Sequence, residues 1–437
     1  MLAAWIDRCR PDGERDVTVR QRRGTIRRPG GEGRLHGVRS VEEVEALAVR
    51  RLPPSIYRSV AHGASQGRTK DENARSFDQV VFRPRAASFY DDRGLSTTVL
   101  GQKIDLPVLA APTGATRLIH PGGAIATACA CASAGTIAVV SQDCGHTIEE
   151  VAAAVASTRR PWQQMYLNRG RSYAEDMIDR AKAAQYGALV LTVDLAVDPD
   201  LRQSWRKKTV RDRPIKADLH TAIHFAPELV RRPRWLSRFM KDSLDIGDMV
   251  AAMASRPGQS KIATWDDIPW IRARWPGPIV FKGIVTAEDA TRAAEMGAAA
   301  IIVSNHGGKA LDDTIPTLRA LMEVVGAVDD TVDVLLDGGV RSGADVVKAI
   351  ALGARAVLVG RPYLWALAVA GEAGVHELFE MFRREIDRTL GLLGCSGVTA
   401  LDRSYVRWPA TWSSGPPAVG NRQSNELRDV NDALSRR

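Results

Sequence analysis

The chain contains 437 residues, of which 45% are hydrophobic and 25% are charged. This length allows one large α/β domain with extensions or two ordinary domains, and the composition is that of a globular protein. No apolar run is long enough to predict a transmembrane helix, and residues 1–39 lack the apolar core and cleavage site of a secretory signal. We therefore expect a cytoplasmic protein.

The net charge of +9 is concentrated in two regions. Arginines crowd residues 1–40, which we predict to form a disordered basic tail, and they recur between Arg202 and Lys241. We interpret both regions as solvated. The alternatives are a peripheral contact with a membrane surface and adventitious binding to nucleic-acid phosphates. Because no nucleic-acid-binding motif accompanies the charge, we expect no specific nucleic-acid partner.

The cysteines do not predict a metal site or a disulfide framework. Their number is odd, and their spacing is not that of metal ligands. We therefore predict small buried side chains and no bound metal at Cys9, Cys129, Cys131, Cys144 and Cys395.

Residues 41–89 are predicted to form helices that pack against the domain that follows them. Beyond them, apolar runs of strand length alternate with segments of helical periodicity, as in βα units. The predicted strands are Leu106–Ala111, Thr136–Val140, Trp162–Leu167, Leu189–Val193, Ile279–Lys282, Ala300–Ser304, Val332–Asp337 and Ala356–Val359. The predicted helices include Pro121–Ala134, Ile148–Ser157, Tyr173–Gln185, Ala287–Met296, Thr317–Val325 and Ala344–Leu352. Most of them end near a glycine suited to a left-handed cap, namely Gly135, Gly187, Gly297 and Gly353.

This alternation predicts an α/β fold, a closed (β/α)8 TIM barrel with an N-terminal helical extension, over residues 41–407. One interval, residues 195–261, is too long for a minimal connection between the fourth and fifth strands. Because it follows the C-terminal end of a strand, we predict a long loop over the active-site mouth. Residues 408–437 are predicted to be a tail.

Two glycine-arginine segments predict a phosphate site. Asp337-Gly338-Gly339-Val340-Arg341 follows the seventh strand and leads into a helix, and Gly360-Arg361 follows the eighth. Glycines let backbone amides approach an anion, and arginines add charge-assisted hydrogen bonds. The ends of strands seven and eight are the recurrent phosphate site of a TIM barrel, so we expect a phosphorylated cofactor there.

Lys282 ends the fifth strand inside the predicted barrel mouth. A lysine in that place needs a counter-charge or an anionic ligand. Beside a flavin it would stabilise the negative charge that develops at the N1 and O2 end of the ring on reduction. A Schiff-base lysine and a structural salt bridge are the alternatives.

His306 follows the sixth strand within Ser304-Asn305-His306-Gly307-Gly308-Lys309. At this position it could take a proton from a substrate near neutral pH. Asp194, at the end of the fourth strand, could orient the imidazole and stabilise its protonated form, as in catalytic triads. The alternative is a structural histidine.

Together these residues resemble the family of FMN-dependent α-hydroxy-acid oxidases and dehydrogenases, which includes glycolate oxidase, lactate oxidase and mandelate dehydrogenase. The resemblance covers about residues 41–407. It implies His306 as the catalytic base, Asp194 as its partner and Tyr166 as the active-site tyrosine of a Gln-x-Tyr motif. It also implies FMN contacts from Pro112, Thr113, Gly114, Ser141, Gln164, Thr192, Lys282, Ser304, Asp337, Gly338, Gly339, Arg341, Gly360 and Arg361.

The chain departs from the family where the substrate carboxylate binds. The family uses two arginines and two tyrosines, but the arginine expected after His-Gly-Gly is Lys309. The N-terminal tyrosine aligns best with Ser59, although Tyr57 lies two residues earlier, and the other arginine is assigned to Arg202 within an altered pattern. Substrate contacts are therefore expected from Tyr166, Arg202, His306 and Lys309.

The resemblance implies oxidation of a 2-hydroxy acid to a 2-oxo acid, with two electrons passing to the flavin and on to oxygen or another redox carrier. The altered clamp and Arg232-Pro233-Arg234-Trp235-Leu236 also look like the branch that oxidatively deaminates the peptide-derived precursor of mycofactocin. A flavin-dependent isomerase and a non-catalytic flavin-binding module are more remote alternatives. Relatives are often tetramers, so a homo-oligomer is expected.

Overall fold

The computed structural model describes residues 35–412 except residues 36, 156–158, 198, 200–226, 242–262, 329 and 331. Arg202, Cys9, most of the predicted basic tail and most of the predicted C-terminal tail lie outside the described residues. The same is true of most of the interval 195–261.

The predicted barrel is confirmed. Eight parallel strands form one sheet in the order β4-β11-β10-β9-β8-β7-β6-β5, and a bridge between Ala110 and Ala138 joins its two edges. The strands match the eight apolar runs of the sequence to within a few residues. They are β4 (Val108–Ala110), β5 (Val139–Ser141), β6 (Trp162–Met165), β7 (Ala188–Thr192), β8 (Ile279–Ile284), β9 (Ala300–Val303), β10 (Asp333–Asp337) and β11 (Ala356–Val359).

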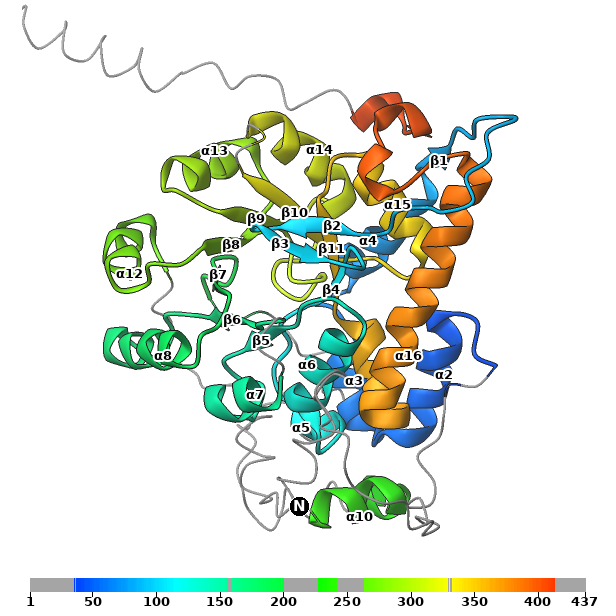
Figure 1. Ribbon diagram of the computed structural model, residues 1–437. Helices are drawn as coiled ribbons and strands as arrows, with labels where there is room; N and C mark the ends of the chain where they lie inside the picture. Colours follow the sequence, from blue (N-terminus) through cyan, green and yellow to red (C-terminus); the bar gives the residue numbers. More distant parts are fainter. Residues whose placement is uncertain are drawn as a thin grey trace, which may run out of the picture.

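Helices surround the strands in a ring (Figure 1). They are α5 (Thr116–Ile119), α6 (Gly123–Ser133), α7 (Ile148–Ala154), α8 (Arg171–Ala183), α12 (Ile268–Arg274), α13 (Ala287–Glu295), α14 (Thr317–Ala327), α15 (Gly343–Ala351) and α16 (Arg361–Leu393). Capping boxes at Thr147 and Ser342 begin α7 and α15. Left-handed glycines follow α6, α13 and α15 as predicted, but after α8 the left-handed residue is Gln185 and not Gly187.

Two apolar layers hold the barrel together. Inside it, alternate residues of the strands form one buried cluster that includes Val190, Ile302 and Leu335. Outside it, the other faces of the same strands pack against the helices. The strands are therefore buried on both sides, which explains why they appear in the sequence as continuous apolar runs.

The sequence analysis did not predict a hairpin that covers the N-terminal end of the barrel. It consists of β2 (Thr97–Val99) and β3 (Gln102–Ile104), which pair antiparallel and lie across the centre of the helix ring in Figure 1. Val99 and Ile104 are fully buried in the cluster inside the barrel. The hairpin thus closes the end opposite to the strand tips.

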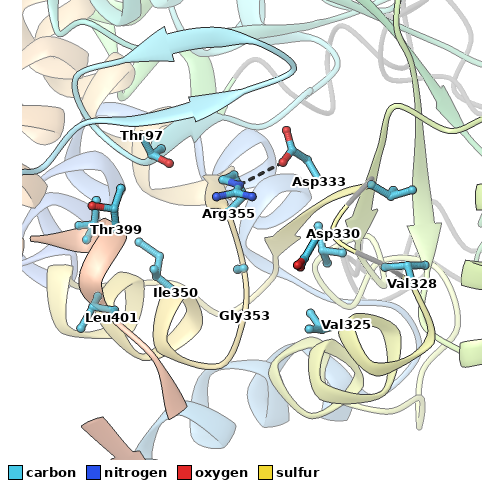
Figure 2. A pocket seen from close by; sticks show the side chains of 14 residues that line it. Thr97, Val325, Val328, Asp330, Asp333, Ile350, Gly353, Arg355, Thr399 and Leu401 are labelled. Atoms are coloured by element: carbon cyan, nitrogen blue, oxygen red, sulfur yellow. Dashed lines mark hydrogen bonds and ion pairs between the residues drawn. The ribbon is translucent and has the colours of Figure 1, made fainter. Parts of the chain in front are cut away.

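A pocket of about 200 Å³ lies at this N-terminal end, beside the starts of β10 and β11. Figure 2 shows the ion pair between Arg355 and Asp333 within it, and Asp333 also accepts a hydrogen bond from the backbone of Leu100 in the hairpin. Residues at this face of a TIM barrel contribute to stability, whereas the opposite face carries the chemistry.

The N-terminal extension is helical, as predicted, and packs on the barrel. It comprises α2 (Val41–Arg51), α3 (Pro54–Ala61) and α4 (Arg68–Asp78), with α2 against α16 and α4 against α14. A short antiparallel pair, β1 (Val81–Phe82) and β12 (Val406–Arg407), joins the segment before the barrel to the segment after it. Single 3-10 turns occur at Trp265–Asp267, Val398–Ala400, Arg403–Tyr405 and Ala410–Trp412.

One described piece of the long interval is a helix, α10 (Pro233–Lys241). Trp235 is buried and donates a hydrogen bond from Nε1 to the backbone oxygen of Leu118 at 2.9 Å. Arg232 donates from Nε to the backbone oxygen of Leu52 at 3.0 Å. The helix is therefore attached to both α5 and the N-terminal extension.

Candidate active site

A cavity of about 400 Å³ lies at the C-terminal ends of the strands. Most of the predicted site residues line it, although they come from all parts of the barrel. These residues are Pro112, Thr113, Gly114, Ser141, Tyr166, Lys282, His306, Lys309, Asp337, Gly338, Gly339, Arg341, Gly360 and Arg361. Four others, Gln164, Thr192, Asp194 and Ser304, lie behind this lining and contact one another or residues in it.

His306 occupies an unusual backbone conformation. His306, Gly307 and Gly308 all have positive φ angles, of 59°, 61° and 73°. A left-handed histidine costs on the order of 1–2 kcal/mol, and such strain is concentrated at functional sites. Gly308 cannot be replaced easily, because an added Cβ would lie 2.4 Å from the backbone nitrogen of Lys70. The turn therefore depends on the glycines that the sequence motif contains.

His306 lies between Asp194 and Tyr166. Its Nδ1 is 3.1 and 3.2 Å from the two carboxylate oxygens of Asp194, and its Nε2 is 3.5 Å from the Tyr166 hydroxyl. Gly283 leaves room for this arrangement, because an added Cβ would lie 2.5 Å from the Cβ of Asp194. A carboxylate only accepts hydrogen bonds, so the imidazole places its proton on Nδ1 and leaves Nε2 free to accept another.

The charges in this cluster favour an ionised Asp194. Burial opposes ionisation, but His306 and Lys282 outweigh it and hold the pKa of the Asp194 carboxyl below its ordinary value. Burial and the negative charge of Asp194 raise the pKa of the Tyr166 phenol. The cluster thus combines a fixed negative charge, an imidazole and a phenol that stays protonated at physiological pH.

Lys282 forms the ion pair that the sequence analysis considered as an alternative. Its Nζ is 2.9 Å from Asp337 Oδ2 and donates to Ser304 Oγ at 2.7 Å. The pair is almost fully buried, yet both residues line the cavity. Ser304 also accepts the backbone N–H of His306, so the lysine and the histidine share one support.

Two arginines lie at the predicted phosphate end. Arg361 begins α16 and donates to the backbone oxygens of Val60, His62 and Gly307. Burial and the neighbouring Arg341 guanidinium lower the pKa of Arg361 to about 10, and burial also lowers the pKa of Arg341. Two neighbouring, half-buried cations are stabilised by a negative charge between them, and a phosphate would supply it.

Two buried oxygen atoms also indicate a missing polar ligand. Gln164 donates from Nε2 to Thr192 at 3.0 Å, but its Oε1 has no hydrogen-bond partner among the described residues. The same is true of Oδ1 of Asp337. Buried polar atoms are rarely left without partners. Together with the arginine pair, these atoms fit a phosphorylated cofactor with polar groups on its ring.

The expected carboxylate clamp is not assembled from the described residues. Lys309 lies half-buried in the cavity wall, where its Nζ donates to the backbone oxygen of Ser59 at 2.5 Å. Burial and the Arg361 guanidinium lower the pKa of Lys309 to about 7. Tyr57 donates its hydroxyl to Glu45 and does not line the cavity, whereas Ser59 lines it but donates to the backbone oxygen of Ile56.

Sequence reasoning missed three residues that hold the His306 loop in place. Asn73 and Asn305 form a reciprocal amide pair with distances of 2.8 and 2.9 Å. Asp312 accepts the backbone N–H groups of Gln66, Gly67 and Thr69 at the start of α4. Asn305 belongs to the histidine motif and Asp312 lies three residues after its end, and this proximity to His306 was the available signal. Asn73 had none, because its partners lie more than 230 residues away in the sequence.

Other kinds of site were not found in the described part of the chain. It contains no group of three His, Cys, Asp or Glu side chains that could hold a metal ion. The four cysteines that the structure describes are buried, and no disulfide joins any two of them. None of the described helices has the length and apolarity needed to cross a membrane.

Comparison with known proteins agrees with this geometry. Residues 48–408 match the family of FMN-dependent dehydrogenases. The chain is 40% identical to the pre-mycofactocin synthase of Mycobacterium tuberculosis (strain CDC 1551 / Oshkosh), over 85% of this chain and 94% of that protein. It is 39% identical to the L-lactate oxidase of Nostoc sp. (strain PCC 7120), over 83% of this chain and 96% of that protein.

The fold agrees as well. The crystal structure of the monotopic membrane protein (S)-mandelate dehydrogenase superposes with a TM-score of 0.76 and 32% identity, covering 86% of this chain and all of that one. The chain therefore belongs to the family of FMN-dependent dehydrogenases and is an FMN-dependent oxidoreductase with a TIM-barrel fold.

Proposed function

We propose that the protein oxidises an amine-bearing carbon in a peptide-derived substrate of the pre-mycofactocin type, with His306 as the base. One observation carries the choice of substrate. Lys309, at the place where relatives that act on small 2-hydroxy acids carry an arginine, is turned to the backbone oxygen of Ser59 and has a pKa of about 7. It is therefore a weak anchor for a carboxylate.

The chain's own residues would hold FMN at two places. The Gly338-Gly339 turn with Arg341, Gly360 and Arg361 would receive the phosphate. Lys282, Asp337, Gln164, Thr192, Ser141, Ser304 and the segment Pro112-Thr113-Gly114 would contact the ring and its attached chain. When bound, FMN supplies a two-electron acceptor within reach of the substrate.

His306 would take the proton that the substrate loses as two electrons leave its carbon. Nε2 is the free acceptor, and the carboxylate of Asp194 would stabilise the imidazolium that forms. Tyr166, which remains a phenol, would donate a hydrogen bond to the heteroatom on the reacting carbon. The product of amine oxidation is an imine, which water converts to a ketone and ammonia.

The weakened clamp supports a substrate that has no free carboxylate at this position. The family binds a small acid by charge and by bidentate hydrogen bonds, and a lysine lacks the planar fork of arginine. A larger peptide-derived substrate obtains its affinity from many contacts and does not need that clamp. The 40% identity to a pre-mycofactocin synthase agrees with this proposal but does not separate it from the 39% identity to a lactate oxidase.

The second candidate is oxidation of a 2-hydroxy acid to a 2-oxo acid. The arrangement of His306, Asp194 and Tyr166 suits either substrate, and Lys309 still places a nitrogen donor at the cavity wall. The likeness to (S)-mandelate dehydrogenase and L-lactate oxidase favours this candidate. Oxygen and a redox carrier are both open as electron acceptors, and a homo-oligomer remains a prediction.

An anaerobic absorbance titration of the FMN-loaded protein distinguishes the candidates. We would add glycolate, lactate and mandelate in one series and a cyclic, amine-bearing dipeptide of the mycofactocin-precursor type in another. Bleaching by the amine alone supports the proposal, and bleaching by a hydroxy acid alone overturns it in favour of the second candidate. His306→Ala should retain FMN and lose almost all bleaching; normal bleaching in this variant would refute the base assignment.

A further inference from the structure

Beneath α10 lies a third, smaller pocket in which arginines converge from three elements. It is lined by Arg51 at the end of α2, Arg117 of α5, and Arg234 and Arg238 of α10. No acidic residue lines it, and the wall is completed by His120, Trp235, Ile119, Pro121 and Ala368. Figure 1 shows α10 at the bottom of the view, below α5.

None of the four arginines forms an ion pair with a residue in the described part of the chain. Arg51, Arg234 and Arg238 make no side-chain hydrogen bond or ion pair with a described residue. Arg117 donates one bond, to the backbone oxygen of Gly145, and its Nε is buried without a partner. Guanidinium groups brought together without anions repel one another, and a buried unsatisfied donor adds a further cost.

The contacts of α10 show that this convergence is built into the fold. Trp235 is bonded to Leu118, Arg232 to Leu52, and the buried Glu228 accepts the backbone N–H of Ser55. These bonds fix α10 across α2, α3 and α5. Because Arg234 and Arg238 are four residues apart, they lie on the same face of the helix.

The electrostatics agree with close approach of the cations. Burial, followed by the charges of Arg238 and Arg234, lowers the pKa of Arg51. Burial and the charge of Arg238 lower the pKa of His120 to about 4, so the histidine is neutral at physiological pH. Its Nδ1 accepts the backbone N–H of Gly122, which leaves its other nitrogen as a donor.

We infer that this pocket binds one oxyanion, a phosphate or phosphate monoester, on Arg51, Arg117, Arg234 and Arg238. The cavity holds about 20 Å³, room for one water-sized group such as a single oxygen of the anion and too little for a whole cofactor. Arg234 at its rim is exposed, so the rest of the anion would face solvent. Four guanidinium groups without carboxylates provide the donors that phosphate prefers. The anion can be free in solution or the headgroup of a phospholipid, since both present the same chemistry.

The site adjoins the active-site cavity without belonging to it. Ile119 lines both, and Leu118, which Trp235 holds through its backbone oxygen, lines the active-site cavity. An anion that drew α10 toward α2 would therefore brace the α5 wall of the substrate cavity. This inference is independent of which substrate the enzyme oxidises.

The test uses the FMN-loaded protein, so that the cofactor occupies its own phosphate site. Thermal unfolding is followed in increasing phosphate at constant pH and ionic strength, with chloride as the balancing anion. We compare wild type with Arg51→Gln/Arg238→Gln and with a matched control, Arg231→Gln/Arg319→Gln. Both control arginines are exposed and lie outside the pocket.

Phosphate should raise the melting temperature of wild type and of the control by about 2 °C at ten times its dissociation constant, and the response should saturate. The Arg51→Gln/Arg238→Gln protein should show no such response and should be at least as stable as wild type without phosphate, because it relieves repulsion. The inference would be overturned if phosphate raised the melting temperature of all three proteins equally. It would also be overturned if wild type showed neither a response to phosphate nor binding to vesicles.

Vesicles distinguish the two sources of the anion. Cosedimentation is measured with phosphatidylcholine vesicles that contain phosphatidate and with vesicles of phosphatidylcholine alone. Binding to phosphatidate by wild type and the control, but at least about tenfold weaker binding by Arg51→Gln/Arg238→Gln, assigns a lipid headgroup. A response to free phosphate that is lost in Arg51→Gln/Arg238→Gln, together with no binding to vesicles, assigns a soluble ligand. The site would be refuted if all three proteins bound vesicles equally and the phosphate response of wild type were not lost in Arg51→Gln/Arg238→Gln.

Discussion

Replacing Asp194 by asparagine keeps the shape of the side chain but removes the negative charge beside His306. The carboxylate oxygen lies 3.1 Å from Nδ1, and its side chain is 9% exposed. At an effective dielectric constant of about 20, a pair of unit charges at that distance interacts by about 5 kcal/mol. The amide dipole of asparagine recovers part of this energy, so we expect the barrier to proton transfer to rise by about 3–5 kcal/mol. The rate should then fall by about 10²–10⁴-fold.

The rate of flavin reduction measures this effect directly. Anaerobic stopped-flow mixing of Asp194→Asn with the substrate that bleaches wild type gives the rate of the chemical step, and the absorbance spectrum gives the FMN content. Asp313→Asn is the control, since this carboxylate is exposed and pairs with Arg68 at the surface. A reduction rate for Asp194→Asn within threefold of wild type, at full FMN content, would refute the role of Asp194 as the partner of the base.

Three further predictions address the substrate anchor and the support of the site. Burial lowers the pKa of Lys309 to about 7, so its positive charge is present below that pH and is lost above it. The wild-type protein should therefore bind a small 2-hydroxy acid more weakly as the pH rises from 6 to 8.5. Lys309→Arg should bind the acid more tightly and independently of pH. Equal pH profiles of the two proteins in spectral titrations would contradict this. Gly339→Ala should lower the free energy of unfolding by at least about 3 kcal/mol, because φ is 87° and the new Cβ would lie 2.2 Å from the backbone oxygen of Asn73. Gly101→Ala, where φ is 74° and nothing lies within 4 Å of the new Cβ, should lower the free energy of unfolding by only about 1–2 kcal/mol. Equal losses for Gly339→Ala and Gly101→Ala in urea unfolding would argue against the clash. Asn73→Ala should cost about 2–4 kcal/mol in the same assay, because it leaves the buried amide of Asn305 without its reciprocal partner; a loss below about 0.5 kcal/mol would show that the amide pair does not support the loop.

The barrel could be predicted because its signals are local. Each strand is buried on both sides, and most are apolar runs, although β6 contains Gln163 and Gln164. Glycines or capping residues mark the ends of several helices. The residues at the C-terminal ends of the strands could be recognised for the same reason. Lys282, the His306 motif and the two glycine-arginine turns each lie at the end of an apolar run or directly after it. In a parallel barrel, that position alone places a residue at the mouth.

Other features depend on contacts between distant residues, and periodicity carries no information about them. The hairpin β2–β3 is short, and four of its six strand residues are polar. It closes the barrel end only because the barrel strands surround Val99 and Ile104. The amide pair of Asn73 and Asn305 likewise requires α4 to lie against the His306 loop.

The order of strands and helices and the residue types at the mouth can be read from the sequence, because both follow from neighbours along the chain. How those residues are used depends on the folded arrangement. Lys282 pairs with Asp337, Tyr57 turns to Glu45, Lys309 loses much of its charge through burial, and four arginines meet beneath α10. Each outcome depends on which groups share a low-dielectric space, and that is settled only when the chain has folded.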